Sequence, residues 1–187
     1  MTDLSEKVPC VECGKPVSAK LAKCRNGRCL QCNLERNPFF VLYNGLIQRV
    51  HGPGGSFESL SESERLYYTL TLFQNEVNNG GFHQFFFNSS GCYYDLTENG
   101  LAMLDESVNL RLLQQAKEIV FPGAMVPSDT HTRREVMPLV DRDDARPLWV
   151  ERLDELDQRF YANPDSLTPK LEAFARKHGL VPDKYQD

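Results

Sequence analysis

Two pairs of cysteines near the N-terminus constrain the fold of this chain more than any other feature of its sequence. Each pair has the spacing Cys-x-x-Cys: Cys10 and Cys13 form the first, Cys29 and Cys32 the second, and fifteen residues lie between the pairs. Two pairs at this spacing can surround one Zn²⁺ with four thiolates in a tetrahedron. A segment of under about forty residues buries too little apolar surface to fold alone, so the metal would supply the folding free energy. We therefore predict one structural zinc ion, bound by Cys10, Cys13, Cys29 and Cys32.

Other interpretations of these cysteines stay open. A fifth cysteine, Cys24, lies between the two pairs and has no partner at the same spacing. It could replace one of the four ligands, although we rank it outside the site. The paired cysteines could also be a redox pair or inert thiols. Four thiolates would leave zinc no open coordination position, so we interpret the site as structural rather than catalytic.

The composition of the chain predicts a cytoplasmic protein. Its first residues, Met1 to Pro9, are polar and charged, unlike a signal peptide. No apolar run approaches the ~20 residues that are needed to cross a bilayer, so we expect no membrane association. In a reducing compartment the six cysteines would be thiols or metal ligands rather than disulfides.

Charge is distributed unevenly along the chain. Residues 1–37 contain seven Lys and Arg against four Asp and Glu, a net charge of +3, whereas residues 38–187 contain fourteen against twenty-two, a net charge of −8. We therefore predict a zinc-ribbon-like module with four cysteine ligands over residues 1–37 and an acidic domain over residues 38–187. Phosphates and carboxylates repel each other, so direct nucleic-acid binding is not expected of the acidic domain, although the basic head could bind nucleic acid.

The acidic domain has the periodicity of a set of helices. The strongest signal follows Ser61, which forms a capping box with Glu64. One apolar stripe follows this cap at helical spacing, and it consists of Leu66, Leu70, Phe73 and Val77. The pair Gly80-Gly81 ends this helix. Further helical patterns cover about 38–50, 101–104, 107–120, 144–162 and 168–179. We predict a mainly α protein in which only the zinc module contains strands.

An unusual run of residues follows the capping-box helix. It reads Asn-Glu-Val-Asn-Asn-Gly-Gly-Phe-His-Gln-Phe-Phe-Phe-Asn-Ser-Ser-Gly over residues 75–91. The run resembles the signature of a bacterial domain family of otherwise unknown function that is named after a DNA-mimic protein. The resemblance covers roughly residues 38–180, and the zinc head is similar to an N-terminal addition seen on some relatives. The residues that carry it are Glu76, Asn78, Asn79, Gly80, Gly81, Phe82, Gln84, Phe86, Asn88, Ser89 and Gly91.

This resemblance implies an all-helical, non-enzymatic protein that presents acidic side chains in place of DNA phosphates. Such a surface would occupy the DNA-binding face of a transcription factor or nucleoid protein. The partner would then be a basic, DNA-binding protein.

One helix carries a candidate partner-binding face. At ~100° per residue, the side chains of Asp144, Glu151, Asp154 and Glu155 fall within roughly 100° of one another. An apolar face lies opposite, and it consists of Trp149, Leu153, Leu156 and Phe160. Like charges three and four residues apart cost a few tenths of a kcal/mol each, so a partner could favour them. The alternative is an ordinary solvated helix face.

Three other functions stay open. The protein could be an antitoxin or immunity-type inhibitor that blocks the cleft of an enzyme, or the basic zinc head could bind nucleic acid directly while the acidic domain forms a homodimer. An enzyme would need a site such as Glu76, Asn79 and His83, which are spaced for one helix face. The glycine pair interrupts that helix, and a single histidine beside four phenylalanines is more often a packed core residue. We therefore predict that the protein is not an enzyme.

Overall fold

The computed structural model describes residues 6–138, 147–163 and 167–182. The chain forms two compact units. One unit contains the residues up to Ser59 together with the segment after His178, and the other spans Leu60–His178. The predicted domain boundary after Asn37 stays a prediction.

The first unit begins with a small hairpin and two short helices. Strands β1 (Lys7–Pro9) and β2 (Pro16–Ser18) pair antiparallel, with Val8 opposite Val17. Helices α1 (Ala19–Cys24) and α2 (Leu30–Glu35) follow. The buried residues of this head are Cys10, Val17, Ala22 and Cys32, with Val8 and Cys29 packed against them. Two of the four buried residues are cysteines, so the apolar core is very small.

A longer helix completes the first unit. Helix α3 (Pro38–His51) begins after Asn37, whose side-chain oxygen accepts hydrogen bonds from the amides of Phe39 and Phe40. Pro38 suits the first turn because its missing N–H would have no partner within the helix. The short 3₁₀ helix η1 (Phe57–Ser59) follows, and Arg49 donates to the Ser59 carbonyl at 3.0 Å.

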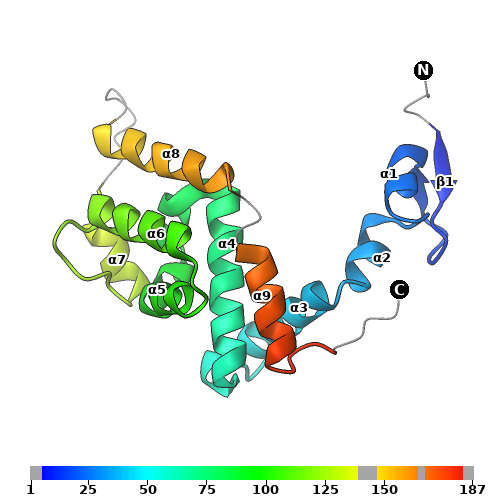
Figure 1. Cartoon of the computed structure of the whole chain (residues 1–187), viewed down its shortest axis with the longest axis horizontal. Helices are drawn as coiled ribbons and strands as arrows, with labels where there is room; N and C mark the ends of the chain where they lie inside the picture. The colour runs from blue at the N-terminus through cyan, green and yellow to red at the C-terminus, as the bar shows by residue number, and fades with distance from the viewer. Residues whose placement is uncertain (1–5, 139–146, 164–166, 183–187) are drawn as a thin grey trace. The chain divides into compact units, whose positions relative to one another are not determined.

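The second unit is built around the long helix α4 (Glu62–Phe87) (Figure 1). The predicted capping box of Ser61 and Glu64 begins α4. Helix α4 packs against η2 (Ser89–Tyr93), α5 (Tyr94–Met103), α7 (Thr130–Val136), α8 (Leu148–Tyr161) and α9 (Leu167–Lys177). Helix α6 (Ser107–Val120) packs against α5 and α8.

The core of the second unit is aromatic. The ring of Phe73 meets the rings of Phe82, Phe85 and Phe160 at centroid distances of 6.1, 5.2 and 5.8 Å. The last two contacts are edge-to-face, the arrangement that aromatic quadrupoles favour. Among the described residues, the only strands lie in the N-terminal head, so the predicted mainly α fold is confirmed. None of the helices in residues 6–138, 147–163 and 167–182 is long and apolar enough to cross a membrane.

Candidate metal centre and family motif

The structure brings the four predicted cysteines together. Cys10 follows β1, Cys13 lies in the hairpin turn, Cys29 caps α2, and Cys32 lies in the first turn of α2. Their four Sγ atoms all lie within 4.8 Å of one another. The Sγ atoms of Cys13 and Cys29 are 3.7 Å apart, close to the edge of about 3.8 Å expected for a tetrahedron with Zn–S bonds of about 2.3 Å. The cluster could therefore hold a metal ion.

Backbone amides donate hydrogen bonds to two of these sulfurs, and such donors favour the ionised thiolate. The amide of Cys29 donates to Cys10 Sγ at 3.2 Å, and the amide of Cys32 donates to Cys29 Sγ at 3.4 Å. Amide donors from Cys13 and Cys29 lower the pKa of Cys10 to about 6. The neighbouring sulfurs, that of Cys29 first, raise the pKa of Cys32. Metal binding requires cysteine ligands in the thiolate form, so these amide donors favour the form of Cys10 that could bind a metal.

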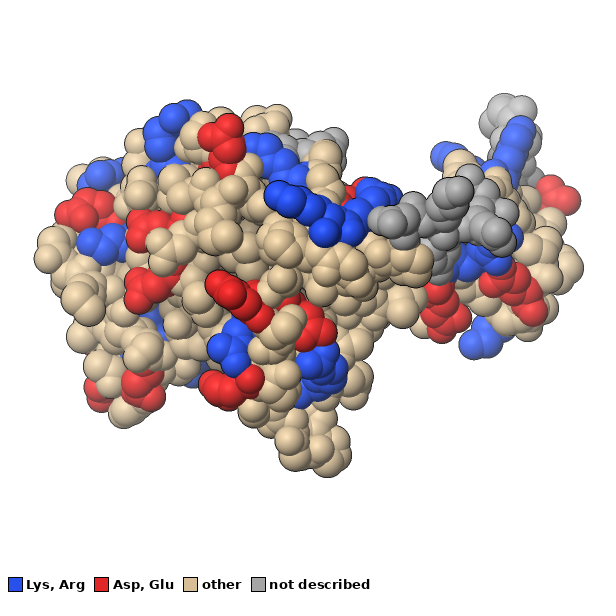
Figure 2. Space-filling model, turned by 60° about the horizontal axis from the view of Figure 1, so that its bottom comes forward, with Lys and Arg blue, Asp and Glu red and all other residues tan. Residues whose placement is uncertain are grey.

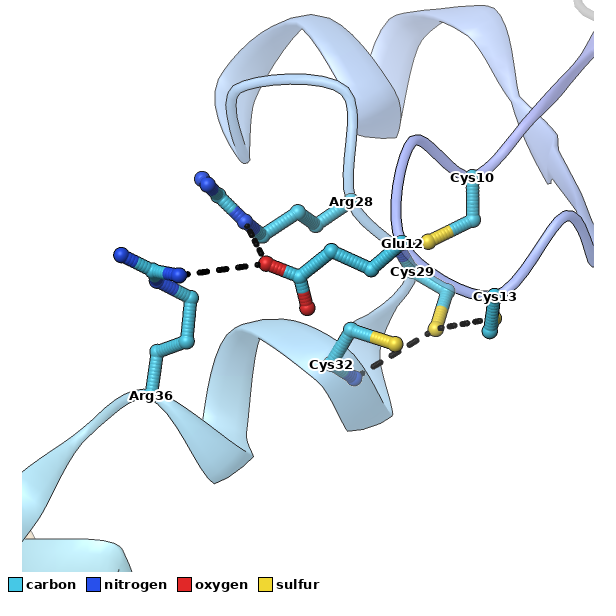
Figure 3. Close-up of polar contacts among 7 residues, drawn as sticks. All are labelled: Cys10, Glu12, Cys13, Arg28, Cys29, Cys32 and Arg36. Atoms are coloured by element: carbon cyan, nitrogen blue, oxygen red, sulfur yellow. Dashed lines mark hydrogen bonds and ion pairs between the residues drawn. The ribbon is translucent and has the colours of Figure 1, made fainter.

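An acidic side chain joins the two halves of the cysteine cluster (Figure 3). Glu12, between the first two cysteines, accepts from Arg28 at 2.6 Å and from Arg36 at 3.4 Å. Arg28 precedes Cys29, and Arg36 caps the C-terminal end of α2, so these ion pairs tie the first cysteine pair to the second. Two basic side chains of the head, Arg28 and Arg36, therefore form ion pairs within the head. The sequence shows only that the head has an excess of basic residues. No local pattern in it indicates that Glu12 pairs with two of them.

Cys24 lies apart from this arrangement. It is the exposed last residue of α1. Among the described residues, the group of side chains placed to hold a metal consists of Cys10, Cys13, Cys29 and Cys32.

The glycine pair of the family motif breaks α4. Gly80 has φ −159° and ψ 27°, and Gly81 has φ 75° and ψ −176°, so neither is helical. The positive φ favours glycine at position 81, and a Cβ there would collide with the carboxylate of Asp157. That carboxylate accepts a hydrogen bond at 2.8 Å from the amide of Phe82, where the helical path resumes. Asp157 of α8 thus caps the second half of α4. We name the pair Gly80–Gly81 the helix break.

Polar motif residues span the helix break. Glu76 Oε2 accepts from Gln84 Nε2 at 2.7 Å and from Asn88 Nδ2 at 2.9 Å. Asn79 donates to Gln84 Oε1 at 3.2 Å. These bonds connect the two halves of α4. Asn78 and Ser89 are exposed, whereas Phe82 and Phe86 are core residues.

A buried arginine holds the end of the motif. Arg133 of α7 has 0% exposure and donates to the carbonyls of Phe86 and Asn88, both at 2.6 Å. It also donates to the carbonyls of Pro127 and Ser128 at 2.8 and 3.1 Å. A Cβ on Gly91 would collide with this guanidinium, which explains the last glycine of the motif. Arg133 was not predicted from the sequence, because nothing local distinguishes it from the exposed Arg134.

Three of the four residues of the predicted partner-binding face lie on α8. Glu151 and Glu155 are exposed, Asp154 is half-buried, and Asp144 lies outside the described residues. Leu153, Leu156 and Phe160 are buried on the opposite side, as predicted, while Trp149 is half-buried. We call Glu151, Asp154 and Glu155 the α8 acidic face.

Comparison with known families decides where this chain belongs. Residues 58–178 match the family described as DMP19-like protein, which is well over half of the chain. The chain belongs to this family. No curated protein and no solved structure matches it. The match lies within the second unit apart from two residues of η1, so the cysteine cluster is an addition to the DMP19-like domain.

The DMP19-like domain has a pronounced negative charge. Residues 58–178 contain 12 Lys and Arg against 20 Asp and Glu, a net charge of −8. On the face of the molecule that Figure 2 shows, acidic and basic side chains are interspersed rather than gathered in one band.

Proposed function

We propose that this protein is a non-enzymatic binding module whose acidic helical surface occupies the DNA-binding surface of another protein. Membership of the DMP19-like family carries the proposal, because the family is named after a DNA mimic and implies binding to DNA-binding proteins in general. The partner would be a transcription factor or a nucleoid protein. We place both proteins in the bacterial cytoplasm.

The α8 acidic face is the surface that we assign to this partner. Glu151 and Glu155 are exposed at i and i+4, where like charges are mildly destabilising in an isolated helix. A basic partner would remove this repulsion and gain charge-assisted contacts. The net charge of −8 over the matched residues would steer the encounter with a basic protein.

We further propose that the cysteine cluster binds one structural Zn²⁺. Thiolates are ligands that zinc prefers, and four of them leave no open coordination position. The metal would organise the hairpin and α2, whose shared core is very small. The head would then offer the partner a second, basic contact surface in addition to the DMP19-like domain.

The proposal is tested by capturing partners with the full-length protein from a bacterial lysate at low salt and identifying them by mass spectrometry. We expect DNA-binding proteins that dissociate at moderate salt, because exposed charges are screened over about 10 Å at 0.1 M. A single toxin or nuclease as the captured protein would contradict the DNA-mimic proposal and indicate an immunity-type inhibitor instead.

The role of the α8 acidic face is tested on the purified partner with two double variants. Glu151→Gln with Glu155→Gln should weaken binding and reduce its dependence on salt. The matched control is Glu135→Gln with Glu172→Gln, which removes the same charge from surface i,i+4 pairs on α7 and α9. If both variants bound the partner equally well, the assignment of the face would be wrong.

A further inference from the structure

A small cavity lies beside the helix break, inside the DMP19-like domain. Its volume is about 170 Å³. Cavities that hold drug-sized ligands measure about 300–1,000 Å³, so this one has room for a single side chain. It is lined by Gly80, His83, Trp149, Val150, Leu153, Asp154 and Asp157. Gly80 and His83 come from the run of residues 75–91 and the other five from α8, and one of these, Asp154, belongs to the α8 acidic face.

The rings of Trp149 and His83 line the cavity. The ring of Trp149 lies 5.9 Å from that of His83, and His83 stacks on Phe87 at 5.7 Å. The guanidinium of Arg134 lies 4.3 Å from the centre of the Phe87 ring. This row of rings therefore already accommodates one guanidinium at its Phe87 end. Trp149, the best aromatic surface for a cation, lies at the end that lines the cavity.

Two carboxylates also line the cavity. Asp154 and Asp157 are three residues apart on α8 and therefore neighbours on the helix surface. Burial first, and then the like charge of Asp154, raise the pKa of Asp157. Burial also lowers the pKa of His83. The carboxylates of Asp154 and Asp157 line the same cavity as the ring of Trp149, and both kinds of group attract a guanidinium.

We propose that this cavity receives one arginine side chain of the protein partner, stacked on Trp149 and hydrogen-bonded to Asp154 and Asp157. The proposal rests on the proposed function and specifies the chemistry of its contact. Arginine fits better than lysine, because a planar guanidinium can stack on a ring and donate to two carboxylates at once. Asp157 Oδ1 already accepts from the amide of Phe82, so the guanidinium would meet the other oxygen of Asp157. The motif thus forms part of a binding site as well as a structural break.

The only tryptophan of the chain lies in this cavity, so its fluorescence reports occupancy directly. The probe is N-acetyl-arginine methylamide, titrated into the full-length protein. Its citrulline counterpart has nearly the same shape without the charge and serves as the ligand control. We expect a saturable change in Trp149 emission with the arginine compound and none with the citrulline compound.

Two variants assign the signal to the carboxylates. Asp154→Asn should weaken binding of the arginine probe by about tenfold, the loss of one charge-assisted hydrogen bond. Glu135→Gln, an equal charge change on the exposed surface of α7 outside the cavity lining, should change it by less than about twofold. Asp157 is left intact because it caps Phe82, and circular dichroism should show the same helix content in both variants.

Equal responses to the arginine and citrulline probes, no response to either, or an unchanged affinity in Asp154→Asn would overturn the cavity proposal. The proposed function would survive that result if a DNA-binding protein were still captured in a salt-dependent way. Conversely, arginine binding at Trp149 without such a partner would support the cavity and contradict the DNA-mimic proposal. The two failures are therefore distinguishable.

Discussion

Different interactions stabilise the fold of the head and the fold of the DMP19-like domain. The head has a buried cluster of a few small side chains, and half of its buried residues are the sulfur ligands of a candidate metal site. The DMP19-like domain buries a continuous set of phenylalanines around Phe73 and carries its polar motif on that core. A short segment can therefore depend on a metal for its fold, whereas the larger domain depends on apolar packing and buried hydrogen bonds.

The largest effect should come from removing one metal ligand. Cys32→Ser should abolish stoichiometric zinc and with it the folding of the head, because structural zinc contributes about 10–16 kcal/mol in comparable peptides. Elemental analysis of the purified protein measures the loss. The matched control is Cys24→Ser, which should keep one zinc per chain because Cys24 is exposed and outside the cluster. Loss of zinc in the control instead would place Cys24 among the ligands.

In the DMP19-like domain, a large loss of stability should require truncation of a side chain in the aromatic core. Phe73→Ala should lower the free energy of unfolding by about 3–5 kcal/mol, since Phe73 is 0% exposed and meets three other rings. Phe87→Ala, at an exposed phenylalanine, should cost much less. Urea unfolding followed by the emission of Trp149 measures both. Similar losses in the two variants would argue against the described core.

The buried guanidinium should matter somewhat less than the aromatic core. Arg133→Met should cost about 3 kcal/mol, because it leaves buried carbonyls at the end of α4 without their donor. Arg134→Met is the neighbouring control. Its guanidinium donates to the Phe87 carbonyl at 2.8 Å but is exposed, so we expect a loss below about 1 kcal/mol in the same urea experiment. Equal costs for the two arginines would mean that burial of Arg133 contributes nothing.

The smallest effect concerns the pH dependence of the helix break. The pKa of Asp157 is raised in the folded protein, so the folded state binds this proton more tightly than the unfolded chain does. This group therefore favours folding below its unfolded pKa of about 3.9, and that contribution is lost as the pH rises through the folded pKa. Asp157→Asn keeps an oxygen that can accept from Phe82 but does not titrate.

Relative to Asp157→Asn, the wild-type protein should thus lose stability as the pH rises above about 4. Unfolding by urea between about pH 4 and pH 7 measures the difference between the two proteins. A difference that grows in the opposite direction would show that the hydrogen bond from Phe82 outweighs the burial of the carboxylate.

Local patterns in the sequence were sufficient for much of this architecture. The spacing of Cys10, Cys13, Cys29 and Cys32 predicted their proximity because two short turns bring each pair together. Ser61 with Glu64 predicted the start of α4. The pair Gly80-Gly81 was predicted to end this helix, and it interrupts the helix before the helical path resumes at Phe82, since capping and positive φ are local properties. The mainly α fold followed from helical periodicity alone.

The remaining features depend on contacts between distant segments. Asp157 was one more acidic residue of a helix in the sequence, yet it caps Phe82, 75 positions earlier. Arg133 binds carbonyls more than 40 positions away. Trp149 was predicted on the apolar face of its helix, and the structure places it half-buried at a cavity. No local spacing encodes such partners, because they depend on how α7 and α8 pack against α4.

The difference between the two regions is tested most directly by hydrogen exchange of the full-length protein with and without a zinc chelator. We predict that chelation removes amide protection from β1 to α2 and leaves the protection of α4 to α9 unchanged. Protection that persists in the head after chelation, or that is lost equally from both regions, would contradict the view that a metal organises one region and apolar packing the other.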